Sequence, residues 1–207
     1  MTHFLTISFA LLSLLAASHA EERRILILGD SLTAGYGVDP DQAWPHLIQE
    51  KLNASGHKEW KVLNGGVSGD TTSGGLRRLP WLQKRKIHLL VIALGGNDAL
   101  RGVDPAVTES NLDQMIQLAR VANPDVRILL AGMEISDNMG KEYVEQFATV
   151  FPSVAKREKI PLIPFLLEGV AGDPERNLPD VIHPNEKGHQ AIADLVWPYL
   201  CEILPSP

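Results

Sequence analysis

Three residues of types that together perform nucleophilic catalysis lie next to predicted turns. Ser31 follows an apolar run, and Asp180 and His183 lie three residues apart just before Pro184. A serine hydroxyl needs an adjacent base to attack a carbonyl carbon at neutral pH, and a histidine is the usual base. A carboxylate bonded to the histidine fixes its tautomer and stabilises the imidazolium. The residues therefore predict acyl transfer through Ser31, with His183 as base and Asp180 as its partner.

The same residues have structural interpretations that the sequence alone leaves open. Ser31 could cap a turn or a helix, and Asp180 with His183 could form a turn ahead of a helix. Asp30 and Asp98 are rival carboxylates for the histidine. We expect the Asp30 side chain to point away, because Asp30 adjoins Ser31, whereas nothing in the sequence excludes Asp98.

Acyl transfer also needs hydrogen-bond donors for the oxyanion that develops on the carbonyl oxygen. The candidates are the backbone N–H of Ser31, the backbone N–H of Gly69 in a glycine-rich loop, and the side-chain amide of Asn97. The alternatives are that Gly69 only gives the loop its conformational freedom and that Asn97 forms an Asx-turn.

The elements that must position these residues alternate between strand and helix. Continuous apolar runs that end in turn residues predict buried strands at 24–28, 60–63, 87–94, 126–131 and 162–166. The expected helices are one capped by Asp41, one from about Thr72 with a kink at Pro80, one opened by Asp104 and Pro105, one over 143–154 and one from about Asn185. Five strands alternating with five helices predict a parallel sheet with helices on both faces.

All the candidate residues follow predicted strands. Ser31, the Gly69 loop and Asn97 follow the first, second and third strands, and Asp180 and His183 follow the fifth. The carboxyl ends of parallel strands meet at one edge of the sheet, where ligands bind in open α/β folds. This convergence favours the catalytic interpretation of Ser31.

The composition excludes some classes of partner. The 207 residues carry a net charge of −6, which argues against nucleic acid and against an electrostatic membrane site. Cys201 is the one cysteine, so no intramolecular disulfide forms. It lies in an apolar helical stretch and is expected to pack.

The first 20 residues have the pattern of a secretory signal peptide. Residues 4–17 are almost continuously apolar, and Ser18-His19-Ala20 precedes the first charges. Cleavage is expected after Ala20, although no Lys or Arg precedes the apolar run. The alternative is an uncleaved membrane anchor. We therefore expect a periplasmic or secreted protein, with residues 21–207 forming a single domain.

Several other motif matches fail. Ser153-Val154-Ala155-Lys156 and Ser136-Asp137-Asn138 stand in the wrong order for a serine β-lactamase and lack a K-T-G, and no G-x-S-x-G elbow is present. His183, His189 and Glu186 do not have a zinc-binding spacing. We expect no metal.

Four blocks together resemble the SGNH hydrolases, also called the GDSL family. They are residues 29–32, the Gly69 loop, residues 95–98 and residues 180–183. Residues 43–45, 97–102 and 182–185 are similar to one branch, the small secreted bacterial enzymes called thioesterase I, lysophospholipase or arylesterase. Residues 134–140 depart from that branch in a loop that borders its acyl-binding side.

The resemblance implies a flavodoxin-like, three-layer α/β/α fold. It implies Ser31, Asp180 and His183 as the catalytic triad and Ser31, Gly69 and Asn97 as the oxyanion hole, with no cofactor. The implied enzyme is a monomer that hydrolyses small-molecule acyl esters and thioesters. The alternatives are a carbohydrate acetylesterase on the same scaffold and a non-catalytic lipid-binding module.

Overall fold

The computed structural model describes residues 21–205, so the proposed signal peptide lies outside the described residues. The strands are β1 (Arg23–Gly29), β2 (Trp60–Gly66), β3 (Leu89–Ala93), β4 (Arg127–Ala131) and β5 (Leu162–Ile163). The helices are α1 (Ser31–Ala34), α2 (Trp44–Ala54), α3 (Thr72–Leu82), α4 (Gly96–Leu100), α5 (Pro105–Ala122), α6 (Lys141–Glu158) and α7 (Glu186–Ile203), with a 3-10 turn η1 (Asp137–Met139).

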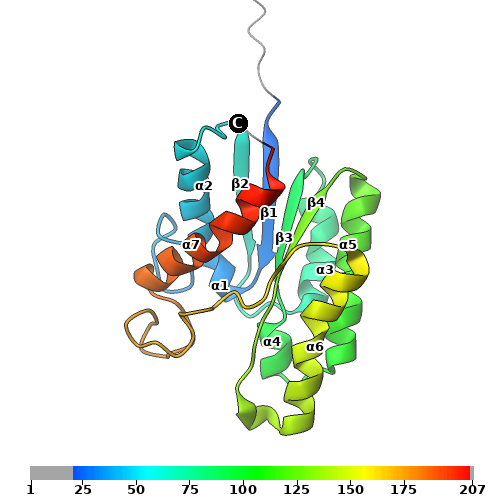
Figure 1. Ribbon diagram of the computed structural model, residues 1–207, viewed down its shortest axis with the longest axis vertical. Coiled ribbons are helices and arrows are strands. Elements are labelled where there is room, and N and C mark those ends of the chain that lie inside the picture. The colour runs from blue at the N-terminus through cyan, green and yellow to red at the C-terminus, as the bar shows by residue number, and fades with distance from the viewer. Residues whose placement is uncertain (1–20, 206–207) are drawn as a thin grey trace, which may run out of the picture.

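The five strands form one parallel sheet in the order β2-β1-β3-β4-β5. The central strand β3 is buried along its whole length, as its continuous apolar sequence predicts. Helices α2 and α7 cover one face, and α3, α5 and α6 cover the other (Figure 1). The predicted three-layer α/β/α fold is confirmed.

The carboxyl ends of all five strands point to one end of the molecule, the lower end in Figure 1. Helices α1 and α4 lie there, directly after β1 and β3. Each has five residues or fewer, too short for a helical periodicity, and neither was predicted. Among residues 21–205, no helix is long and apolar enough to cross a membrane.

Most predicted helix starts are confirmed. The side chain of Asp104 accepts from the N–H of Ala106 at the start of α5, and that of Asn185 accepts from the N–H of Gly188 at the start of α7. The N-cap of α2 was predicted wrongly, because Ala43 and not Asp41 occupies it. Instead, the N–H of Trp44 donates to Nδ1 of the buried His189 on α7 (3.3 Å).

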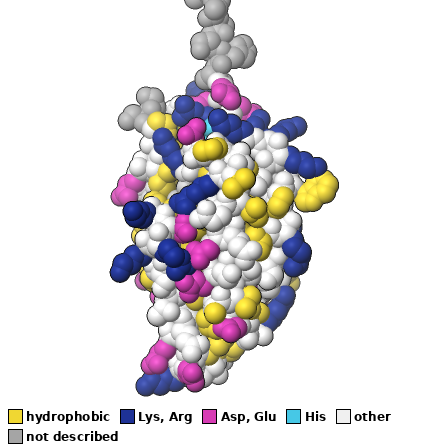
Figure 2. Space-filling model, turned by 90° about the vertical axis from the view of Figure 1, so that its right-hand side faces the viewer, with side chains coloured by type: hydrophobic (Ala, Val, Ile, Leu, Met, Phe, Trp, Pro, Cys, Tyr) yellow, Lys and Arg dark blue, Asp and Glu magenta, His cyan; other side chains and the backbone are white. Residues whose placement is uncertain are grey.

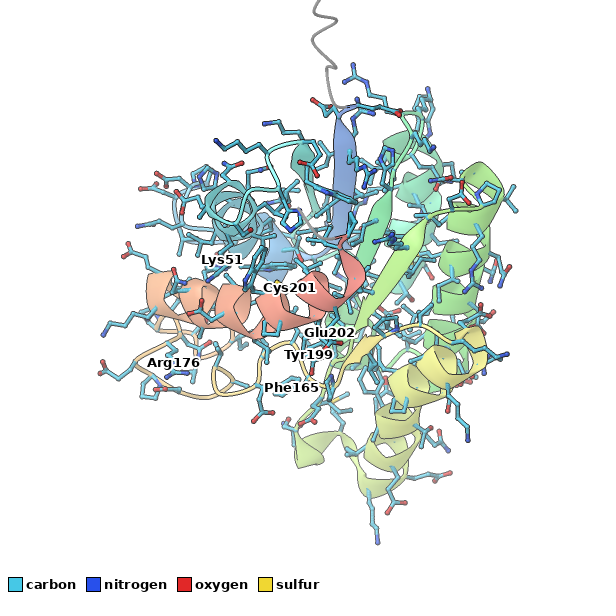
Figure 3. The ribbon with its side chains drawn as sticks, turned by 45° about the horizontal axis from the view of Figure 1, so that its top comes forward. Lys51, Phe165, Arg176, Tyr199, Cys201 and Glu202 are labelled. Carbon is cyan, nitrogen blue, oxygen red and sulfur yellow. The ribbon has the colours of Figure 1, made fainter. Side chains whose placement is uncertain are left out.

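Two further expectations need correction. Strand β5 ends at Ile163 and not at residue 166, because Pro164 has no N–H to donate and the N–H of Leu166 bonds to the carbonyl of Gly132 (2.9 Å). Cys201 does not pack in the core. It is an exposed thiol on the last turns of α7 (Figure 3).

The contact between His189 and Trp44 predicts a pH dependence of stability. Burial lowers the pKa of His189 to about 4, so it is neutral in the folded protein, while the unfolded chain protonates at about pH 6.5. Stability is therefore fully present above about pH 6.5 and falls by about 3 kcal/mol as the pH drops through about 4. His189→Asn keeps an acceptor for Trp44 without titrating, so urea unfolding should show a weaker pH dependence for this variant. Parallel pH profiles for the two proteins would contradict the assignment.

Candidate active site

Ser31 is the first residue of α1 and follows β1 after one intervening residue, Asp30. The Asp30 side chain caps the helix by accepting from the N–H of Leu32 (3.0 Å). Gly29 makes this abrupt change from strand to helix possible. A Cβ at Gly29 would lie 2.1 Å from Oγ1 of Thr33. The exposed fraction of Ser31 is 8 %, and it faces the end of the sheet where ligands bind in such folds.

His183 connects Ser31 to Asp180. Its Nε2 lies 3.0 Å from Oγ of Ser31, and its Nδ1 lies 2.7 Å from Oδ2 of Asp180. Oδ1 of Asp180 accepts from the backbone N–H groups of Ile182 and His183, at 2.9 Å each. The bonds from the His183 backbone and side chain and from the Ile182 backbone lower the pKa of Asp180 to about 2. This carboxylate is therefore ionised at neutral pH and able to hold the imidazolium.

The segment that carries this pair is held by backbone bonds. Asn177 and Pro184 form an isolated bridge, and the N–H of Leu178 donates to the carbonyl of His183 (2.7 Å). Within the segment, Val181 has a φ of +59°, a strained conformation for a β-branched residue. The Tyr36 ring lies over His183, with ring centroids 4.5 Å apart. Neither feature was predicted from the sequence.

Asn97 lies in the first turn of α4, and Gly95, which directly precedes this helix, has a positive φ. Its Nδ2 donates to Oδ2 of Asp30 (3.1 Å), and because an amide nitrogen carries two hydrogens, one remains for a ligand. Asp30 is 2 % exposed, and burial raises its pKa to about 6. Asp30 therefore joins the Ser31 and Asn97 segments instead of serving His183.

Gly69 lies in the loop after β2 with a φ of +76°. Its carbonyl accepts from Nη2 of Arg101 (2.7 Å), which ties the loop to the end of α4. Within the described part of the chain, the N–H groups of Gly69 and Ser31 donate to no other protein group. Arg78 supports the same edge by binding Asp70 (2.6 Å) and the carbonyls of Gly65 and Gly29.

The rival acid Asp98 has a different role. It is fully buried and accepts from the backbone N–H of Thr72 (2.8 Å) and from the Thr72 hydroxyl (2.5 Å), at the start of α3. In residues 21–205, no three His, Cys, Asp or Glu side chains are grouped so that they could hold a metal ion.

Ser31, Asn97 and His183 line one cavity of about 350 Å³, a volume suited to a small ligand. Asp180 lies behind His183, and Gly69 is not part of the cavity wall. The cavity has apolar walls made by Leu32, Leu100, Met133, Ile135, Phe165, Leu167 and Ile182. Leu100 is the last residue of helix α4. Met133 and Phe165 were not predicted as site residues, although they follow the observed strands β4 and β5 at the same sheet edge.

Known proteins match this chain over most of its length. The family described as GDSL-like Lipase/Acylhydrolase matches residues 27–191. Esterase TesA of Pseudomonas aeruginosa is 40% identical over 201 residues, which cover 97% of this chain and 98% of that protein. Thioesterase 1/protease 1/lysophospholipase L1 of Escherichia coli is 40% identical over 187 residues, covering 90% of this chain and 87% of that protein. A crystal structure of TesA superposes with a TM-score of 0.83 at 42% identity, covering 88% of this chain and 100% of that one.

The fold is therefore that of the SGNH hydrolases. The chain belongs to the GDSL-like lipase/acylhydrolase family, and the resemblance read from four short sequence blocks is confirmed.

Proposed function

We propose that this protein is a serine hydrolase of carboxylic esters and thioesters that works through an acyl-enzyme on Ser31. The observation that carries the proposal is the continuous chain of contacts from Oγ of Ser31 through the His183 ring to Asp180, at 3.0 Å and 2.7 Å. Esterase and thioesterase activities are those of the named relatives. The contacts have the geometry that general-base activation of a hydroxyl requires.

In the first half of the reaction, Oγ of Ser31 attacks the acyl carbon while Nε2 of His183 takes the hydroxyl proton. The carbonyl oxygen becomes an oxyanion, which we assign to the N–H groups of Ser31 and Gly69 and the amide of Asn97. The charged Asp180 stabilises the imidazolium through Nδ1. When the intermediate collapses, His183 gives its proton to the departing alkoxide or thiolate.

In the second half, water replaces the leaving group. His183 takes a proton from the water, the resulting hydroxide attacks the acyl carbon, and the second intermediate collapses to release the carboxylic acid. His183 then returns the proton to Oγ of Ser31, which restores the starting state.

The apolar cavity supports an acyl chain as the part of the substrate that is recognised. Each CH₂ group moved from water to an apolar wall contributes about 0.8 kcal/mol. Met133, Ile135 and Phe165 line the same cavity as Ser31 and provide such a surface. A carbohydrate acetylesterase, the second enzymatic interpretation, would bind a sugar through polar groups, and Glu134, Ser136 and Asn138 also line the cavity, but most of the lining side chains are apolar. The cavity therefore favours acyl esters.

Ser31→Ala should abolish hydrolysis of p-nitrophenyl esters, because no other group can form the acyl-enzyme. Thermal unfolding of the variant should resemble that of the wild type, since only one hydroxyl is lost. A fluorophosphonate should label the wild-type protein and not the variant, which also separates an enzyme from a lipid-binding module. Wild-type turnover by Ser31→Ala would refute the proposal.

Asn97→Ala should lower kcat by roughly 10²–10³-fold with a smaller effect on KM, because the amide acts mainly on the oxyanion. Asn138→Ala is the matched control. Asn138 lines the same cavity, but its side chain accepts a hydrogen bond from Ser136 (2.6 Å). Equal losses of kcat in both variants, measured with a short-chain p-nitrophenyl ester, would exclude Asn97 from the oxyanion hole.

We further propose that residues 1–20 export the protein and are removed. The apolar run that ends in Ser18-His19-Ala20 supports this proposal. Expression of the full chain in a Gram-negative host should give a periplasmic protein. Its intact mass should match a chain that begins at Glu21. A membrane-bound product that retains Met1 would indicate an anchor instead.

A further inference from the structure

Exposed apolar side chains gather around the cavity that contains Ser31. Eight large hydrophobic side chains are exposed in residues 21–205. Two of them, Leu100 and Ile182, line this cavity, and three more, Tyr36, Val67 and Val181, lie at the same end of the sheet. We call these five residues the apolar rim: Tyr36, Val67, Leu100, Val181 and Ile182. Their exposed fractions range from 45% to 66%. Such grouping on a protein surface marks an interaction site.

Contacts between the segments show that the apolar rim surrounds one opening. Leu100 and Ile182 line the cavity together with Ser31, and the Tyr36 ring lies over His183. Next to Tyr36, Gly37 lies so close to Leu178 that a Cβ would come within 2.4 Å of its side chain. The carbonyl of Leu178 in turn accepts from the N–H of Val181 (2.9 Å).

The remaining member, Val67, follows β2 and borders the same end of the sheet. Its N–H donates to the carbonyl of Gly29 (3.1 Å), and the preceding Gly66 packs directly against the backbone of Ala34 in α1. Figure 1 shows α1, α4 and the chain that leads into α7 at the end of the molecule to which the strands point. The apolar rim thus combines four separate chain segments around Ser31 and His183.

The other three exposed hydrophobic side chains are Trp81 and Val121, in the last turns of α3 and α5 at the opposite end of the sheet, and Val107, in the first turn of α5 close to the end that carries the cavity. On the side of the molecule turned toward the viewer in Figure 2, hydrophobic side chains are interspersed with charged and uncharged ones. Trp81 and Val121 therefore serve as exposed apolar controls remote from the apolar rim.

We propose that the apolar rim docks this protein on the surface of a lipid aggregate with zwitterionic headgroups, from which acyl chains pass into the cavity. The inference rests on the proposed function. A protein partner or a second copy seated on the rim would close the opening above Ser31. A fluid lipid surface covers the same side chains and also supplies the substrate. An acyl chain then moves between two apolar environments without crossing water.

The charges favour a zwitterionic surface over an anionic one. The chain has a net charge of −6, so a negatively charged membrane repels the molecule as a whole. The acidic residues Asp30 and Glu134 line the cavity, whereas no Lys or Arg is among its lining residues, and Asp180 and Arg101 lie next to it. The apolar side chains therefore provide the attraction.

The test measures binding to phosphatidylcholine vesicles by sedimentation, with Ser31→Ala as the parent protein so that hydrolysis does not alter the lipid. Val67→Asn combined with Val181→Asn removes two rim side chains, and asparagine tolerates the positive φ at position 181. Trp81→Asn combined with Val121→Asn is the control, because both side chains are exposed and lie at the opposite end of the molecule. The rim pair should weaken partitioning about tenfold, and the control pair less than twofold.

The same substitutions in the active protein connect docking to catalysis. The rim pair should lower the rate on a micellar lysophosphatidylcholine relative to the rate on soluble p-nitrophenyl butyrate, whereas the control pair should leave this ratio unchanged. Vesicle binding that is absent in the parent, equally weak in both pairs, or dependent on added phosphatidylglycerol would overturn the inference. If no ester is hydrolysed, the proposed function fails, while the vesicle experiment still decides whether the rim binds lipid.

Discussion

The candidate site depends on the hydrogen bonds that the buried carboxyl group of Asp30 accepts from Leu32 and Asn97. One oxygen caps α1 and the other accepts from Asn97, so a single side chain joins the ends of β1 and β3. These strands are neighbours in the sheet, with Gly29 paired to Ala93. The separation between Ser31 and the Asn97 amide is therefore set by the sheet. Burial opposes ionisation of Asp30, and the two hydrogen bonds partly offset that cost.

The proposed acid–base pair, Asp180 and His183, depends on the sheet much less. Strand β5 has only two residues, and the chain that follows it reaches α7 through turns, with Arg176 at the far side of this loop (Figure 3). The segment is stabilised by its own backbone bonds, including that between the N–H of Asn185 and the carbonyl of Arg176 (2.9 Å). The half of the site that carries Ser31 and Asn97 thus faces a loop that carries His183. The two meet through the contact of 3.0 Å between Ser31 and His183 and through the neighbouring Tyr36 ring.

Much of the fold could be predicted, because buried strands and helix starts are determined by residues that are close together in the sequence. The runs before Gly29 and Gly95 are apolar throughout, as strands buried on both faces must be, and Asp104-Pro105 opens a helix by capping chemistry alone. The predictions that failed depend on distant residues. The acceptor for the N–H of Trp44 at the start of α2 is His189, which lies 145 positions after Trp44 in the chain.

The candidate site likewise combines features that depend on nearby residues with features that depend on distant ones. The order of Ser31, Asn97, Asp180 and His183 after successive strands was enough to place them at one edge. Distinguishing Asp180 from Asp98 required the knowledge that Thr72 occupies both oxygens of Asp98. The walls of the cavity could not be predicted, because Met133 and Phe165 have no distinctive spacing and become neighbours only through the sheet order.

Asp180 and His183, the proposed acid and base, lie within four consecutive residues. Changes in the cavity wall can therefore occur without changes in this pair. The distance between Asp180 and His183 is fixed by the turn that contains them, so it does not change with the length of chain between Ile163 and Asn177. That intervening stretch includes Phe165 and Leu167, which form part of the cavity wall. Insertions and deletions there reshape the space next to Ser31 and leave the proton-transfer pair intact. The architecture thus lets substrate preference diverge while the catalytic chemistry stays the same.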